Sequence, residues 1–377
     1  MSAATMLTAN ASGVVANAVV MADTETIQLY TEGDRLFDAM LAAIENAQKQ
    51  VWLETYIFAD DEVGRRFAHA LSERAKAGVQ VRLLVDAVGS LFQFYRSLGS
   101  DLEQAGVQVH HFHRWYWRKP LRYNRRDHRK LLVVDGCHAF LGGFNIHRES
   151  SQHYFGNARW RDTHASFRGE LAQQAAELFD AFWHGDKHHL PIDNKQAKST
   201  LVANQTRFYR RQLNSIYNDF LGNAKQQVCL TTPYFVPDHH TQKVLIAAVK
   251  RGVEVRLLVP HTGDVRLARW AANAVYARLL DNGVRIFEYL PRMLHAKVAI
   301  VDGNWATLGT ANLDYRSLIQ NYELNLVSRD TDFCHQLQAQ FEEDLKEASA
   351  VCPVRWHQRR WVPRLAEFLG WCVRRWL

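Results

Sequence analysis

The chain repeats one arrangement of motifs, and this internal repeat constrains the fold more than any other feature of the sequence. The stretch NAQKQVWLETYIFADD (residues 46–61) matches NAKQQVCLTTPYFVPD (residues 223–238). Further along, KAGVQVRLLVD (residues 76–86) matches KRGVEVRLLVP (residues 250–260). The two pairs follow each other in the same order at nearly the same spacing, which predicts two copies of one folding unit.

Two further matches extend the repeat. AGVQVHHF (residues 105–112) corresponds to NGVRIFEY (residues 282–289), and HRKLLVVDGCHAFLGGFN (residues 128–145) corresponds to HAKVAIVDGNWATLGTAN (residues 295–312). The spacing between the last pair is shorter, so the first copy carries extra residues before its histidine. These residues, RWYWRKPLRYNRR (residues 114–126), are both basic and aromatic.

Each copy is expected to fold as an α/β unit. Continuous apolar runs such as VRLLV are typical of strands buried on both faces, with helices covering a largely parallel sheet. Gly78 and Gly252 precede such runs, where the end of a helix requires a left-handed residue. Helical spacing of apolar residues is seen in the first copy at Leu36, Phe37, Met40, Leu41 and Ile44. The predicted fold is two pseudo-symmetric α/β/α units packed around one shared active site.

The predicted boundaries follow from the repeat. Residues 1–26 are read as a disordered lead-in, because no Lys or Arg precedes Arg35 and the basic start of a signal peptide is missing. The predicted division of the chain after the lead-in is a first unit at residues 27–192, a linker at 193–205, a second unit at 206–350 and a basic tail at 351–377.

The repeated polar residues point to phosphoryl chemistry. His128 and Lys130 stand two residues apart before an apolar run, and His295 and Lys297 repeat this pattern. Two lysines can neutralise a phosphodiester and the charge that develops on it, while one imidazole attacks phosphorus and the other protonates the leaving alkoxide. A single His-x-Lys would carry little weight, but two copies at equivalent positions make a catalytic role the favoured interpretation.

No metal or other cofactor is expected. Two groups of histidines suggest zinc at first sight, but no acidic or cysteine partners stand at ligand spacing around them. The histidines in question are His110, His111, His113, His184, His188 and His189. The five cysteines are scattered and odd in number, which is typical of reduced thiols and not of a disulfide framework.

The paired HxK(x)4D motifs resemble those of the phospholipase D superfamily, over about residues 27–350. The resemblance implies that the two histidines carry the chemistry and that an asparagine seventeen residues further on contacts the phosphate. Asn145 and Asn312 have this spacing. The aspartate of each motif, Asp135 and Asp302, is usually structural in this superfamily.

A histidine that acts as a nucleophile also needs a partner that orients its other nitrogen. Members of the superfamily use an acidic residue downstream of the motif. We expect Glu323 to serve His295 and Asp162 to serve His128, with Glu149 as a weaker alternative to Asp162.

Within the superfamily the sequence is most similar to bacterial cardiolipin synthases. The similarity lies in ETYIFADDEVGR (residues 54–65), WRDTH (160–164), TPYFVPD (232–238) and GTANLDYRSL (309–318), in addition to the first HxK motif. No apolar run reaches the roughly 18–20 residues of a membrane span, so the shorter type, usually called cardiolipin synthase B, is the expected match.

This resemblance implies transfer of a phosphatidyl group from one phosphatidylglycerol to another, with release of glycerol. His128 would form a phosphohistidine and His295 would act as acid and base. The alternatives are a lipid hydrolase, head-group exchange with phosphatidylethanolamine, a nucleic-acid phosphodiesterase, and a lipid-binding protein without activity. The intact motifs disfavour the last, and the tail described next disfavours nucleic acid.

The C-terminal stretch RWHQRRWVPRLAEFLGWCVRRWL holds six arginines against one glutamate and four of the eleven tryptophans. An amphipathic helix with Arg and Trp is typical of binding to an anionic membrane surface. Docking of this helix on the protein body is the alternative. The apolar face would consist of Trp361, Leu365, Phe368, Leu369, Cys372 and Trp376. The expected location is the cytoplasmic face of the cell membrane, as a peripheral protein.

Overall fold

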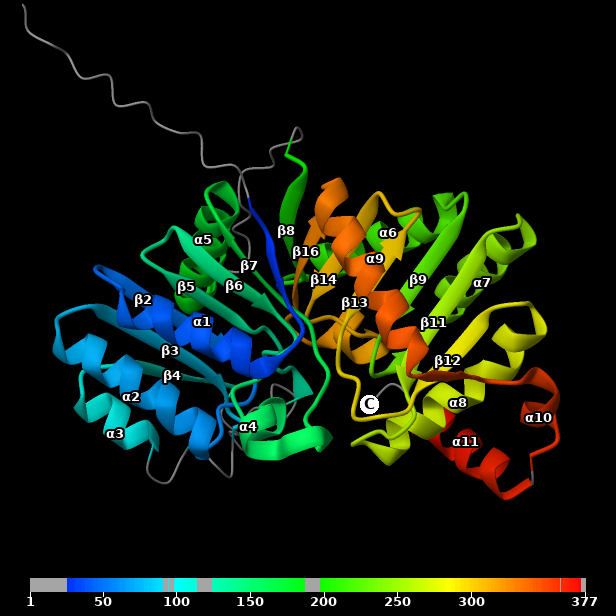
Figure 1. Cartoon of the computed structure of the whole chain (residues 1–377), viewed down its shortest axis with the longest axis horizontal. Coiled ribbons are helices and arrows are strands. Elements are labelled where there is room, and N and C mark those ends of the chain that lie inside the picture. The colour runs from blue at the N-terminus through cyan, green and yellow to red at the C-terminus, as the bar shows by residue number, and fades with distance from the viewer. Residues whose placement is uncertain are drawn as a thin grey trace, which may run out of the picture.

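The structure is a computed structural model. It describes residues 26–90, 94, 98–113, 124–186, 197–359 and 361–373. The predicted lead-in at residues 1–26 therefore lies almost wholly outside the described residues, as does most of the insert at residues 114–126. Two α/β units lie side by side along the long axis of the molecule, the first in blue to teal and the second in green to orange (Figure 1).

The first unit is built on a seven-stranded sheet in the order β1-β7-β6-β5-β2-β3-β4. Strands β2, β3 and β4 are parallel, whereas β5, β6, β7 and β1 join by antiparallel pairing. The strands span Gln28–Tyr30 (β1), Gln50–Thr55 (β2), Gln80–Asp86 (β3), Gln108–Phe112 (β4), Leu131–Val134 (β5), His138–Gly142 (β6) and His164–Arg168 (β7).

Helices flank this sheet (Figure 1). Asp61 begins the second of them by accepting a hydrogen bond from the backbone N–H of Gly64, as an N-cap does. The helices span Gly33–Glu45 (α1), Glu62–Lys76 (α2), Leu98–Gln104 (α3), Gln152–Phe155 (α4) and Glu170–Trp183 (α5), with short 3₁₀ turns at Arg148–Ser150 (η2) and Gly156–Ala158 (η3).

The second unit repeats this plan on an eight-stranded sheet in the order β17-β12-β11-β9-β13-β14-β16-β8. Its strands β9, β11 and β12 are parallel, and a separate short pair joins β10 to β15. The strands span Ser199–Ala203 (β8), Gln227–Thr231 (β9), Phe235–Val236 (β10), Glu254–Pro260 (β11), Arg285–Tyr289 (β12), Val298–Val301 (β13), Trp305–Gly309 (β14), Leu313–Asp314 (β15), Leu324–Ser328 (β16) and Ala348–Ala350 (β17).

The helices of the second unit also follow the repeat. Asp238, at the position equivalent to Asp61, caps its helix by accepting from the N–H of Thr241. The helices span Arg207–Asn223 (α6), His239–Lys250 (α7), Arg266–Asp281 (α8), Thr331–Lys346 (α9), Pro353–His357 (α10) and Trp361–Val373 (α11), with a π-helical turn at Arg316–Gln320 (η4).

Two expectations about the sheets need correction. Each sheet is mixed and not largely parallel, because a tight turn after each HxK strand folds the next strand back beside it as a hairpin. The predicted linker also contains a strand: β8 pairs with β16 at the edge of the second sheet. Its residues alternate between buried (Ser199, Leu201, Ala203) and half-buried (Thr200, Val202), a pattern that suits an edge strand.

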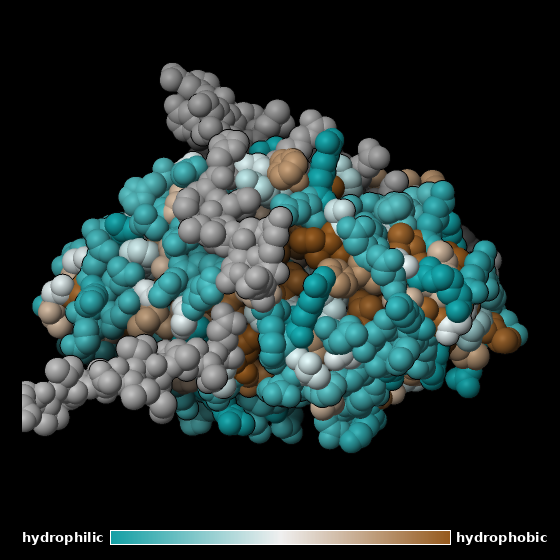
Figure 2. All heavy atoms as spheres, turned by 90° about the horizontal axis from the view of Figure 1, so that it is seen from above, coloured by the Kyte–Doolittle hydropathy of each residue, from teal (hydrophilic) through white to brown (hydrophobic). Residues whose placement is uncertain are grey.

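The core has three parts. Two outer clusters lie within single units, one in each. The third cluster joins the units, because residues of β5 and β6 and of helix α5 pack in one cluster with residues of β13, β14 and α9. The two units therefore share a hydrophobic core and form one body. Seen from above, hydrophilic residues cover most of this described surface, and hydrophobic residues show mainly near its middle (Figure 2).

The aspartate of each motif has a structural place in this fold. Asp135 has a φ angle of 51° and Asp302 one of 52°, the left-handed conformation that the hairpin turns require. The Asp135 carboxylate accepts hydrogen bonds from the backbone N–H groups of residues 48–50, and Asp302 does the same for residues 225–227. Burial opposes ionisation, but these N–H groups lower the pKa of both carboxyls.

Replacing Asp135 by Ala is therefore expected to lower the free energy of unfolding by about 1.5–3 kcal/mol, as measured by urea denaturation at neutral pH. Because the folded-state pKa is lowered, the stabilisation is present above the unfolded value of about 4 and is lost as the pH falls through the folded-state value. Asp302→Ala should behave alike. Equal stability of variant and parent at pH 7 would contradict the role.

Candidate active site

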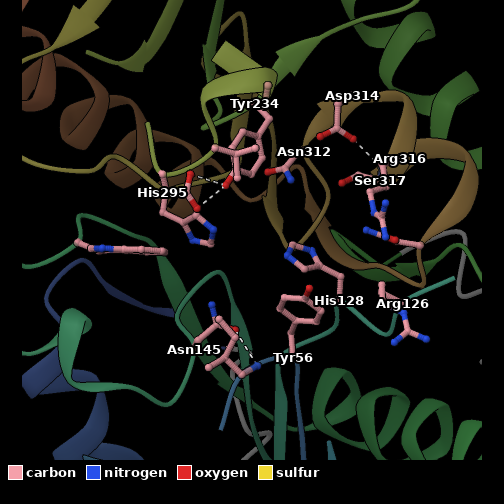
Figure 3. A pocket seen from close by; sticks show the side chains of 16 residues that line it. Tyr56, Arg126, His128, Asn145, Tyr234, His295, Asn312, Asp314, Arg316 and Ser317 are labelled. Carbon is pink, nitrogen blue, oxygen red and sulfur yellow. Dashed lines mark hydrogen bonds between the residues drawn. The ribbon is translucent and has the colours of Figure 1, made fainter. Parts of the chain in front are cut away.

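A cavity of about 230 Å³ lies between the two units. Figure 3 shows His128 and His295 pointing into it from opposite sides, with Asn145 and Asn312 near them. The lining residues are Tyr56, Ile57, Arg126, His128, Asn145 and Trp160 from the first unit, and Tyr234, Asp264, Val265, Ala268, His295, Asn312, Asp314, Arg316, Ser317 and Asn321 from the second.

Backbone hydrogen bonds between the two units hold the segments of both histidines in place. The N–H of His128 donates to the carbonyl of Tyr322 at 2.9 Å, and the N–H of Tyr322 donates back to Arg126. In the other half, the N–H of His295 donates to the carbonyl of Arg161 at 2.7 Å. Each histidine segment thus forms an isolated parallel bridge with a segment of the opposite unit, just before the β-strand that follows it.

The ring of His128 is oriented by acceptors. Its Nδ1 lies 2.9 Å from Oε2 of Glu323 and 3.1 Å from the carbonyl oxygen of Thr310. Both groups accept, so Nδ1 carries the proton and Nε2 keeps its lone pair. Glu323 is itself fully buried and accepts from the Thr310 hydroxyl at 2.6 Å. The ring of Tyr56 packs edge-on against that of His128.

The ring of His295 has a related but different setting. Its Nδ1 lies 2.5 Å from Oδ2 of Asp162 and 2.7 Å from Nζ of Lys297. The same lysine also donates to the backbone carbonyl of His295. The ring of Trp160, the first residue of the WRDTH motif, packs against the His295 ring with centroids 5.0 Å apart.

The structure corrects the expected pairing of carboxylates and histidines. Asp162 serves His295 and Glu323 serves His128, so each pair crosses between the units. The cause is the backbone bridges, which set each histidine beside the segment of the other unit that carries the carboxylate. The weaker alternative, Glu149, contacts His147 instead, at 2.6 Å. The repeat is compatible with pairing inside or between units, so sequence spacing could not distinguish them.

The two lysines lie behind the histidines. Lys130 and Lys297 are each only 2% exposed, and neither is among the residues that line the cavity. Nζ of Lys130 donates to the carbonyl of His128 at 2.8 Å. Burial and the charge of Lys297 lower the pKa of Lys130 to about 7, and burial lowers that of Lys297 to about 8.

Both imidazoles are neutral at pH 7. Burial lowers the pKa of His128 despite the attraction of Glu323. Burial and Lys297 lower the pKa of His295 to about 4 against the attraction of Asp162. An anionic phosphodiester between the rings would favour their charged forms and raise both values. Without a bound anion both rings therefore keep a lone pair, and a bound anion makes it easier for one of them to carry the proton that a leaving group needs.

The asparagines differ between the halves. Oδ1 of Asn145 accepts from the backbone N–H of Ile57 at 3.3 Å, whereas Oδ1 of Asn312 is buried and has no hydrogen-bond partner among the described residues. Asp135 and Asp302 do not line the cavity, and their contacts lie at the far ends of the strands. Their predicted structural character agrees with these contacts.

Sequence reasoning missed several residues of the cavity. Arg126 was seen only as the end of the basic insert; it is 2% exposed and pairs with buried Asp86. The remaining missed residues include Tyr56, Tyr234, Asp264, Asp314 and Arg316. They lie within the repeated stretches or just beyond them, at positions where the copies differ, so a search for repeated residues passes over them. Within the described part of the chain, no group of three or more metal-ligating side chains is seen.

Solved structures share the fold. Phosphatidylserine synthase of Haemophilus influenzae Rd KW20 has a TM-score of 0.70 at 13% identity, covering 93% of this chain and 95% of that one. Polyphosphate kinase of Porphyromonas gingivalis has a TM-score of 0.62 at 14% identity, covering 88% of this chain and 49% of that one. At these identities the likeness is one of fold.

Sequence comparisons define the family. A family model described as cardiolipin synthase, PLD-like domain, matches residues 40–183 and 217–345. Cardiolipin synthase 2 of Bacillus anthracis is 37% identical over 360 residues, which cover 91% of this chain and 69% of that protein. Cardiolipin synthase A of Pseudomonas aeruginosa is 36% identical over 362 residues, with 93% and 72% covered.

The chain therefore belongs to the cardiolipin synthase family of phospholipase D-like proteins. The predicted resemblance, the fold of two phospholipase D-like units and the assignment as an enzyme of this phosphatidyltransferase family are confirmed.

The crossed pairs can be checked by NMR of selectively labelled histidines. Glu323→Gln is expected to change the tautomer and titration of His128 and to leave those of His295 nearly unchanged. Asp162→Asn should do the reverse. Each variant should also lower kcat by on the order of 10²–10⁴-fold, because a histidine without its orienting carboxylate is a poorer nucleophile or acid. A change at the histidine of the same unit would contradict the crossed arrangement.

Proposed function

We propose that this protein is a cardiolipin synthase that transfers a phosphatidyl group from one phosphatidylglycerol to another through a phosphohistidine on His128. The observation that carries the proposal is the pair of histidines on opposite sides of one cavity, each with Nδ1 held by a buried carboxylate of the opposite unit. The named relatives support the choice of cardiolipin as the product.

In the first step, Nε2 of His128 attacks the phosphorus of the donor. A bond forms between Nε2 and phosphorus, and the bond from phosphorus to the glycerol oxygen breaks on the opposite side. His295 gives its proton to that oxygen, and glycerol leaves. Lys130, Lys297, Asn145 and Asn312 are proposed to stabilise the charge on the phosphoryl oxygens, the lysines from just behind the histidines.

In the second step, a glycerol hydroxyl of the acceptor lipid gives its proton to His295. Its oxygen bonds to phosphorus while the bond from phosphorus to Nε2 of His128 breaks, which restores both histidines. Water in place of the acceptor would give phosphatidic acid, and this hydrolysis is the alternative activity of the same site. The named relatives, which are cardiolipin synthases, disfavour the nucleic-acid alternative.

The first experiment uses the purified chain with vesicles of labelled phosphatidylglycerol. Cardiolipin and free glycerol should appear together. His128→Ala and His295→Ala should each abolish turnover, whereas the matched variant His153→Ala, at an exposed position of α4, should not. Phosphatidic acid as sole product would make the protein a hydrolase. Trapped phosphate on His295 with none on His128 would reverse the roles of the two histidines.

The lysine environment predicts an unusual pH dependence. Lys130 and Lys297 are charged only below their lowered pKa values of about 7 and about 8. An anionic donor should therefore bind progressively less well as the pH rises through this range, so that kcat/KM, which reports the free enzyme, falls above about pH 7–8. A value of kcat/KM that stays constant to pH 9.5 would contradict this electrostatic role.

We also propose that the protein binds the membrane peripherally, on its cytoplasmic face. No helix among the described residues is long and apolar enough to cross a bilayer. Helix α11 packs on α8, where Gly370 lies against the backbone of Trp270 and Ala271, and Arg359 pairs with Glu367. The helix is therefore docked on the protein body, which was the alternative prediction for the tail. Even so, the side chains of Phe368 and Leu369 are 61% and 52% exposed.

These two apolar side chains are proposed to enter the lipid interface. The double variant Phe368→Ala with Leu369→Ala should reduce co-sedimentation with phosphatidylglycerol vesicles by about tenfold or more, because each side chain loses apolar area that the membrane buries. Phe208→Ala, which removes an aromatic ring that is 72% exposed on α6, provides the control. Equal loss in both variants would argue against a dedicated surface on α11.

A further inference from the structure

The polar groups of the cavity are unequally divided between the two units. The histidines, lysines and asparagines occur in both. Among the further polar side chains of the second unit that line the cavity are Tyr234, Asp264 and Asp314, and the repeat places different residues at their equivalents in the first unit. The pairs of equivalent positions are Ile57 and Tyr234, Ser90 and Asp264, and His147 and Asp314.

In the first unit none of these three positions places a polar side chain in the cavity. The Ser90 hydroxyl is fully buried; it accepts from the N–H of Phe58 and donates to the carbonyl of Tyr56, both at 3.1 Å. His147 pairs with Glu149 and does not line the cavity. Ile57 presents an apolar side chain to it.

In the second unit the equivalent residues face the cavity. The Tyr234 hydroxyl donates to both carboxylate oxygens of Asp264, at 2.6 and 2.7 Å. Asp314 is 6% exposed and accepts from the N–H of Ser317 at 2.7 Å. Figure 3 shows Tyr234, Asn312 and Asp314 on the same side of the cavity, across from Asn145 and Tyr56.

Asn312 independently indicates that a ligand binds on the side of the cavity formed by the second unit. Its side chain is 4% exposed and lines the cavity, but its buried Oδ1 has no partner among the described residues. A buried amide oxygen without a partner is costly and calls for a donor. In the first unit Asn145 already has such a donor in Ile57. Of the two asparagines, only Asn312, on the side of the cavity formed by the second unit, therefore still lacks a hydrogen-bond donor.

We propose that Tyr234, Asp264 and Asp314 form a subsite for a polyol, the glycerol group of the leaving and of the incoming alcohol. Carboxylates accept from hydroxyl groups, and two carboxylates on one wall suit an alcohol with neighbouring hydroxyls. The inference rests on the proposed function, because it assigns the alcohol side of the same phosphodiester.

The geometry of an in-line displacement at phosphorus agrees with an alcohol subsite in the second unit. If His128 of the first unit attacks phosphorus, the leaving oxygen departs toward His295 of the second unit, and Tyr234 lies on that side of the cavity (Figure 3). The residues that occur in both units contact the phosphoryl group in the same way from both sides. Tyr234, Asp264 and Asp314, whose equivalents in the first unit differ, then decide which of the two ester oxygens faces His295, and so which bond breaks.

The test measures how the phosphatidyl group partitions between two alcohols. Phosphatidylglycerol vesicles are incubated with deuterated glycerol and 1-propanol at equal concentration, and mass spectrometry measures labelled phosphatidylglycerol against phosphatidylpropanol. The unaltered protein should prefer glycerol. Tyr234→Phe, Asp264→Asn and Asp314→Asn should each lower this preference about tenfold or more. The product ratio is independent of how fast a variant turns over.

Tyr56→Phe is the matched control, since it removes a hydroxyl from the opposite wall of the same cavity and should leave the product ratio unchanged. An unchanged ratio in all three second-unit variants, with transfer intact, would overturn the subsite alone. Formation of phosphatidic acid without any transfer product by the unaltered protein would overturn the proposed function, and with it the acceptor role of the subsite.

A binding measurement tests the subsite without turnover. Saturation-transfer NMR on the His128→Ala protein should detect glycerol but not 1-propanol, and adding Asp264→Asn should abolish the glycerol signal. A glycerol signal that persists in the double variant would contradict the subsite whatever the enzyme produces.

Discussion

The arrangement of the molecule depends on the contact between the histidine of each HxK motif and a carboxylate of the opposite unit. His128 needs Glu323, and His295 needs Asp162, and each carboxylate reaches its ring only because a backbone bridge joins the two units beside it. The shared core behind the histidines keeps these bridges in register. Each histidine is oriented by a residue of the other unit, so the site is complete only when both units are folded and packed together.

The sequence predicted what the two copies share and little of what joins them. The repeat located both histidines and the strands behind them, since identical motifs fold alike. It could not tell whether Glu323 faces the histidine of its own unit, because a carboxylate at a fixed spacing fits either arrangement. The mixed character of the sheets was missed for a related reason: β5 is buried on both faces, so its apolar run looks like that of a parallel strand.

The site keeps its charges close together and largely out of water. Burial lowers the pKa of both lysines, and the charge of Lys297 lowers that of Lys130 further. An anion that entered the cavity would favour the charged forms of these lysines and of the histidines.

The crossed contacts also bear on how unlike the two walls of the cavity can be. A contact from unit one to unit two, matched by its counterpart from unit two to unit one, is the geometry of a two-fold symmetric homodimer. Two separate copies of a single unit could assemble the same cavity, but both walls would then be identical. In a single polypeptide the walls need not match: Ile57 lines this cavity in one unit where Tyr234 lines it in the other, so the cleft has two unlike ends.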